Sequence, residues 1–133
     1  DDPKTVPDFD FADWERTYRG LLDRARQANP ALKIVLCTPF AAPCGKIVEG
    51  ALGEYYPLRQ RILAQCCVIV ERIAADYGAT LVPFHRLIAD LETRLPNGDA
   101  TYWVWDGIHP TPAGQRLMAD CWIGAAARNG VME

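Results

Sequence analysis

The chain has 133 residues, half of them apolar, and its 14 Lys and Arg against 17 Asp and Glu give a net charge of -3. This is the size and composition of one globular domain, which can bury a core without a metal or a disulfide. Basic residues form no cluster, and no apolar run approaches the roughly 20 residues of a membrane helix. We therefore expect neither a nucleic acid nor a membrane as a partner.

Two residue counts bear on the chemistry. The chain contains no serine and five cysteines: Cys37, Cys44, Cys66, Cys67 and Cys121. An odd number of cysteines at irregular spacing is typical of buried reduced thiols and favours neither a disulfide framework nor a zinc site. We therefore expect a cytoplasmic location and no metal or cofactor.

The first elements in chain order are a helix, a strand and a long loop. Apolar residues at three-to-four spacing predict a helix from Phe11 to Asn29, with Asp10 as its cap. The apolar run at 33–38 predicts a strand buried on both faces, as in a parallel sheet. Residues 39–56 are rich in Gly and Pro, which predicts a loop that lines a site.

A second helix, strand and third helix follow. A long apolar stripe predicts a helix over about 58–77 that stops at Gly78. Residues 80–84 predict a second short strand, and 87–95 a helix that ends at the Pro-Asn-Gly turn of 96–98.

The last helix begins with Thr111 as cap and Pro112 in its first turn. The complete order predicts an α/β fold containing a right-handed βαβ unit. Two all-apolar parallel strands require further strands beside them and helices on both faces. We therefore expect an N-terminal segment of the same protein, outside these residues, to carry the remaining strands.

The pair Asp106 and His109 carries the clearest chemical signal. Two residues separate them on a Gly-containing loop that leads directly into a helix. Such a loop can fold the carboxylate onto one imidazole nitrogen, which leaves the other nitrogen free for general acid/base catalysis. On spacing alone, a plain turn at Asp106 is the favoured explanation of the pattern.

The context of this pair resembles a known family. The segment Asp-Gly-Ile-His-Pro-Thr-Pro-Ala-Gly at 106–114, after Tyr-Trp-Val-Trp, resembles the last motif of the SGNH hydrolases, also called GDSL lipases or esterases. The strand that ends in Thr-Pro-Phe at 38–40, the Gly/Pro loop, the long helix and the strand at 78–83 follow that family's C-terminal half in order. The resemblance covers about 11–126.

The resemblance implies a serine hydrolase of carboxylic esters with a three-layer, flavodoxin-like parallel sheet that has helices on both faces. In this interpretation residues 1–133 are the C-terminal portion of one such domain, and Asp106 and His109 complete a catalytic triad. The nucleophilic Ser and the oxyanion donors would lie in the N-terminal segment of the same protein. Gly98-Asp99-Ala100 does not replace them, because Ala stands where the nucleophile would be.

The substrate is then a small-molecule ester. Nothing in the chain resembles an interfacial lid or an amphipathic anchor, so small acyl groups are favoured, with an acetylated carbohydrate as one candidate. Phe40, Trp103 and Trp105 are the candidate substrate-binding residues, although all three could equally be packing residues. His85, after the second strand, could also touch a substrate.

Two alternatives remain at this point. Cys37 or Cys44 could act with His109 as a cysteine hydrolase, although burial in the core explains Cys37 more simply. The chain could also be a non-catalytic fragment or interaction module that pairs through its sheet edge.

Overall fold

The computed structural model describes residues 9–94 and 99–132 and divides the chain into two compact units, Asp1–Leu32 and Lys33–Glu133. The first unit contains helix α1 (Phe11–Ala28). The Asp10 carboxylate accepts the backbone N–H of Asp13 at 2.9 Å, and Asn29 ends the helix. The predicted helix is thus confirmed with its cap, and none of its residues is buried.

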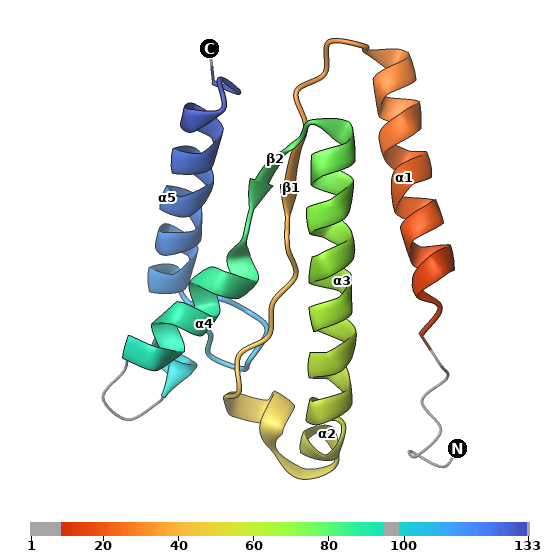
Figure 1. Cartoon of the computed structure of the whole chain (residues 1–133). Coiled ribbons are helices and arrows are strands. Elements are labelled where there is room, and N and C mark those ends of the chain that lie inside the picture. The colour runs from red at the N-terminus through yellow and green to blue at the C-terminus, as the bar shows by residue number, and fades with distance from the viewer. Residues whose placement is uncertain (1–8, 95–98, 133) are drawn as a thin grey trace. The chain divides into compact units, whose positions relative to one another are not determined.

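The second unit is built on two short parallel strands, β1 (Val35–Cys37) and β2 (Thr80–Val82), with Val35 opposite Thr80. The long helix α3 (Tyr56–Tyr77) connects them and contacts both, while α5 (Pro112–Arg128) contacts β2. In Figure 1 the strands lie between α3 on one side and α5 on the other. The predicted α/β fold with a parallel βαβ unit is confirmed.

Helix α4 (Phe84–Arg94) begins three residues earlier than the apolar pattern indicated. The predicted second strand therefore ends at Val82 instead of Phe84. The physical reason is Pro83, whose carbonyl accepts the backbone N–H groups of Arg86 and Leu87 and so starts the helix. The helix end predicted at 96–98 lies outside the described residues.

The long loop after β1 is more ordered than the sequence indicated. It contains a 3-10 helix η1 (Gly45–Val48) and a short helix α2 (Gly50–Glu54), and α3 follows at once. Gly45 and Gly50 both have positive φ, +61° and +51°, and each starts one of these short helices. The loop predicted over 39–56 therefore contains two short helices that its Gly and Pro content did not indicate.

A small core fixes this loop against the C-terminal part of the chain. Val104 and Ala42 are fully buried in it, and Cys44 is nearly so. Ile88 of α4 and Ala100, from the 3-10 helix η2 (Ala100–Tyr102), complete the cluster. Because three distant segments meet there, the loop at 103–111 has a fixed position beside the loop that follows β1.

Candidate active site

The loop at 103–111 is a narrow hairpin. The backbone N–H of Thr111 donates to the carbonyl of Trp103 at 2.9 Å, and that of Trp105 donates to the carbonyl of His109 at 3.2 Å. Val104 and Pro110 pair as an isolated antiparallel bridge. The hairpin places residues 106–109 at its tip.

Asp106 and His109 contact each other at that tip. The imidazole Nδ1 lies 2.7 Å from Oδ2 of Asp106. The other carboxylate oxygen, Oδ1, accepts the backbone N–H groups of His109 at 2.8 Å and Ile108 at 3.0 Å. Three hydrogen bonds therefore hold the carboxylate, and the turn itself provides two of them.

These contacts determine the protonation of the pair. The hydrogen bond from the backbone N–H of His109, followed by the one from its side chain, lowers the pKa of Asp106 to about 2. Asp106 is therefore a carboxylate at neutral pH, and Nδ1 of His109 must carry the proton they share. The His109 side chain is 68% exposed, and Nε2 has no hydrogen-bond partner among the described residues. Nε2 can thus exchange a proton with a bound molecule.

The turn depends on close backbone packing at Gly107. This residue has φ +90°, and a Cβ there would lie 1.9 Å from Cγ2 of Ile47 and 2.6 Å from the carbonyl oxygen of Cys44. Its own carbonyl accepts the backbone N–H of Ala42 at 2.9 Å. The loop after β1 therefore packs against the turn that carries Asp106 and His109.

Thr111 connects the hairpin to α5 as the sequence predicted. Its hydroxyl donates to the carbonyl of Tyr102 at 2.7 Å and accepts the backbone N–H of Gly114 at 3.1 Å. The same side chain thus caps the helix and anchors the base of the hairpin.

An apolar pocket of about 380 Å³ reaches the tip of the hairpin at Ile108, although neither Asp106 nor His109 lines it. Phe40, a predicted substrate-binding residue, lines it together with Ile47, Ile62 and Leu63, and Arg59 is its single charged residue. Ile108 also lines it and is 48% exposed, although it sits between Asp106 and His109. Ile108 was not among the residues predicted from the sequence. An exposed apolar residue between two polar candidates in a loop could have indicated it.

The structure places the two tryptophans differently. The Trp105 ring is 57% exposed, and its centroid lies 6.2 Å from that of His109. Trp103 instead packs against the small core and makes an edge contact with Tyr102. Trp105 therefore remains a candidate for substrate contact, whereas the contacts of Trp103 are those of a packing residue.

The cysteine candidates are held as thiols. Cys44 is buried, and its Sγ donates to the carbonyl of Val104 at 2.8 Å. Burial raises the pKa of Cys44 and also that of Cys37, which has Cys121 nearby. Burial raises the pKa of Cys67 to about 11. Since the thiolate is the nucleophile, these environments argue against a cysteine hydrolase.

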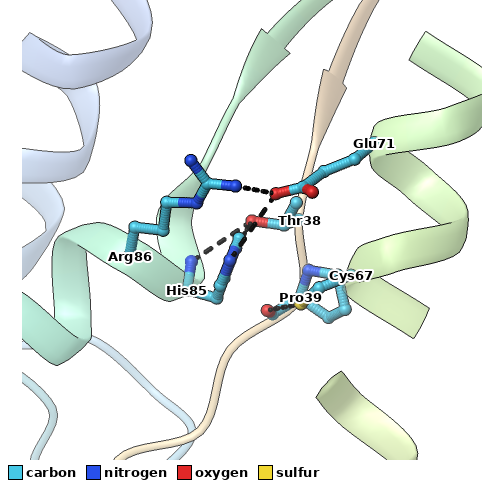
Figure 2. Close-up of polar contacts among 6 residues, drawn as sticks. All are labelled: Thr38, Pro39, Cys67, Glu71, His85 and Arg86. Carbon is cyan, nitrogen blue, oxygen red and sulfur yellow. Dashed lines mark hydrogen bonds and ion pairs between the residues drawn. The ribbon is translucent and has the colours of Figure 1, made fainter. Parts of the chain in front are cut away.

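His85 belongs to a separate polar cluster, shown in Figure 2. Its Nδ1 lies 2.7 Å from the hydroxyl of Thr38, which also accepts the backbone N–H of His85 at 3.2 Å. Nε2 lies 3.8 Å from Glu71, which pairs with Arg86. The order hydroxyl, imidazole, carboxylate imitates a triad, but Thr38 is only 2% exposed and cannot reach a substrate.

Asp99 has a structural role in the described chain. It caps η2 by accepting the backbone N–H of Thr101 at 2.9 Å and its hydroxyl at 2.6 Å. Among residues 9–94 and 99–132, no group of three His, Cys, Asp or Glu side chains could hold a metal ion. No helix in this part of the chain combines the length and the hydrophobicity needed to cross a bilayer.

The Asp-His pair thus lies on a turn that leads directly into α5, the last described helix of a parallel α/β fold. The family comparison makes this specific: the model of the GDSL-like lipase/acylhydrolase family matches residues 4–117, and the chain belongs to this family. Among solved structures it is similar to a protein from Parabacteroides merdae that is assigned as a GDSL-like lipase. The TM-score is 0.71 at 28% identity, over 85% of this chain and 48% of the other. No curated protein matches significantly.

Proposed function

We propose that the protein hydrolyses carboxylic esters and that this chain supplies the acid/base half of a Ser-His-Asp triad. The observation that carries the proposal is the 2.7 Å contact between Nδ1 of His109 and an Asp106 carboxylate that two backbone N–H groups hold in place. Family membership supports the same reaction class.

In this mechanism Nε2 of His109 takes the proton from a serine hydroxyl while the serine oxygen attacks the acyl carbon. The imidazolium then gives that proton to the alkoxide as the ester C–O bond breaks. Water repeats both steps and releases the acid. Asp106 stays ionised throughout, which stabilises the imidazolium and holds the ring in one tautomer.

The nucleophile must come from outside these residues, because the chain contains no serine. The chain spans about half of the Parabacteroides protein to which it is similar. We therefore assign residues 1–133 to the C-terminal portion of one SGNH domain, with the nucleophile and the oxyanion donors on an N-terminal segment of the same protein. Strand β1 has an edge that no strand covers among the described residues, where such a segment can pair.

The apolar pocket beside His109 is the proposed site for the acyl group. Ile108 and Phe40 form part of its wall, and its lining is apolar apart from Arg59, which suits an acyl group. The alcohol would then lie toward the open side, near the exposed ring of Trp105. A small acyl ester of a polar alcohol, such as an acetylated carbohydrate, fits this division.

The test is Asp106→Asn in the full-length protein. An amide cannot impose the same tautomer on His109, so kcat for a p-nitrophenyl acetate assay should fall by about 10⁴-fold, as in serine triads, with an unchanged circular dichroism spectrum. Asp99→Asn is the matched control, since Asp99 also caps a short turn but contacts no candidate catalytic residue. Equal activities of the two variants would remove Asp106 from the mechanism.

A further inference from the structure

A second pocket, of about 300 Å³, is not used by the proposed reaction. It lies between α3, α4 and residues 39–41. Its apolar wall includes Leu63 and Ile88, and its polar groups come from Tyr56, Gln60, His85 and Glu92. A largely apolar cavity with a few convergent polar groups is the usual form of a small-molecule site.

The polar groups of this pocket are mainly hydrogen-bond acceptors. The amide nitrogen of Gln60 donates to the carbonyl of Ala41 at 3.2 Å and also contacts the hydroxyl of Tyr56. These two contacts use the nitrogen, so the amide oxygen remains available to a ligand. A ligand that brings donors would therefore match the lining.

The acidic group of this pocket is the carboxyl of Glu92. Its carboxyl has no hydrogen bond or ion pair among the described residues, and burial raises its pKa. Glu92 is only partly buried. Partial burial of a carboxylate without a partner still costs free energy, part of which a bound cation would recover. The pocket thus has an acidic group that no basic group of the described residues pairs with.

Among the residues that the structure describes, no lysine or arginine lines the pocket. Arg86 lies nearby, but its guanidinium is paired with Glu71, as Figure 2 shows. His85 does line it, but burial lowers its pKa and keeps the ring neutral, with Nδ1 held by Thr38. An anionic ligand would find no counter-charge there.

We propose that this pocket binds a small organic cation, an ammonium group on a short apolar stem, with Glu92 as its counter-ion. The ammonium donates to the Glu92 carboxylate and to the amide oxygen of Gln60, while the stem packs on Leu63 and Ile88. The aromatic rings of Phe40 and Tyr56 add a surface that favours cations. Phe40 and Leu63 also line the proposed acyl pocket, whereas Glu92, Gln60, Tyr56 and Ile88 do not line it.

The experiment is calorimetric titration of the full-length protein with n-butylammonium chloride, beside sodium butyrate and 1-butanol. We expect saturable binding of butylammonium alone, weakened at least tenfold in Glu92→Gln. Asp90→Asn removes the same charge from the same helix and should leave the affinity unchanged. Butylammonium binding should also persist in Asp106→Asn, the variant expected to lose hydrolysis. A failure of the binding proposal can therefore be told apart from a failure of the proposed hydrolysis.

Ala89→Leu is the second variant, because it puts a larger apolar side chain on the pocket wall and leaves Glu92 intact. It should block butylammonium in a protein with an unchanged melting curve. Absence of saturable binding to the wild type, equal binding to Glu92→Gln, or equal binding of butyrate or butanol would each overturn the proposal.

Discussion

At the scale of single residues, Asp106 shows how a short turn can hold a carboxylate against an imidazole. One carboxylate oxygen binds two backbone N–H groups of its own turn, which leaves the other oxygen directed at the imidazole of His109. The turn closes only because residue 107 is a glycine. It adopts φ +90°, and its neighbours leave no room for a side chain there. The identity of residue 107 is therefore as restricted as that of the two polar residues.

Gly107→Ala tests this restriction. The new methyl would meet backbone oxygens that cannot move separately, so we expect a loss of unfolding free energy on the order of 3 kcal/mol or more. Gly50→Ala is the matched control, because Gly50 also has positive φ but open space around it, and should cost only about 1 kcal/mol. Urea unfolding measures both; equal losses would show that the contacts at Gly107 do not matter.

Ile108→Ala tests the proposed acyl pocket. Removing the side chain widens the pocket beside His109, so the preference should shift from acetyl toward longer acyl esters, by about tenfold in the ratio of kcat/KM values. Ile123→Ala, at an equally exposed isoleucine on α5, should leave the ratio unchanged. An unaltered ratio in Ile108→Ala would place the acyl group elsewhere.

At the scale of elements, the junction of β1 and α4 depends on Thr38. Its buried hydroxyl binds both the backbone and the ring of His85, at the start of the helix after β2. The two strands are only three residues long, so a polar contact at their carboxyl ends supplements a short ladder. This cluster is a structural link and not a second catalytic centre.

Thr38→Val keeps the volume of the side chain and removes the hydroxyl. The partly buried His85 then loses two hydrogen bonds, and the free energy of unfolding should fall by about 1–3 kcal/mol. Thr38→Ser restores the hydroxyl and should recover most of that loss. The kcat for ester hydrolysis should stay unchanged in Thr38→Val; a loss of several orders of magnitude would instead make Thr38 catalytic.

At the scale of the whole molecule, the sheet of the described residues has two strands. Both faces of the strand pair are contacted by helices, but an edge of β1 has no strand partner in the described chain. The match to the similar solved protein covers 85% of this chain but only 48% of that protein. The acid/base pair and the proposed nucleophile would thus meet only in the assembled domain.

A fluorophosphonate that labels active-site serines tests this arrangement. In the full-length protein it should modify one serine N-terminal to these residues, as located by peptide mass spectrometry. Labelling should slow strongly in His109→Ala, because the proton acceptor is lost. An adduct on Thr38 or Cys44 would contradict the assignment, and absence of any adduct would favour an interaction module that pairs through the β1 edge.

Much of this organisation could be predicted from local patterns. Helix α1 with its Asp10 cap, the end of α3 at Gly78 and the Thr111 cap of α5 are all local features that neighbouring residues decide. The α/β order followed from the same signals. The short helices at 45–54 escaped prediction because their glycines resemble loop residues, and only their packing shows that they begin helices.

The sequence by itself determined the candidate pair, Asp106 and His109, because two side chains this close on one turn can contact each other. Only the tertiary structure decided what surrounds the pair: Ile108 and Phe40 share a pocket although 68 positions separate them. It likewise showed that Thr38 holds His85 and that Glu92 faces a cavity without a partner among the described residues. Contacts between distant segments depend on how α3 and α4 pack, and no local pattern encodes that packing.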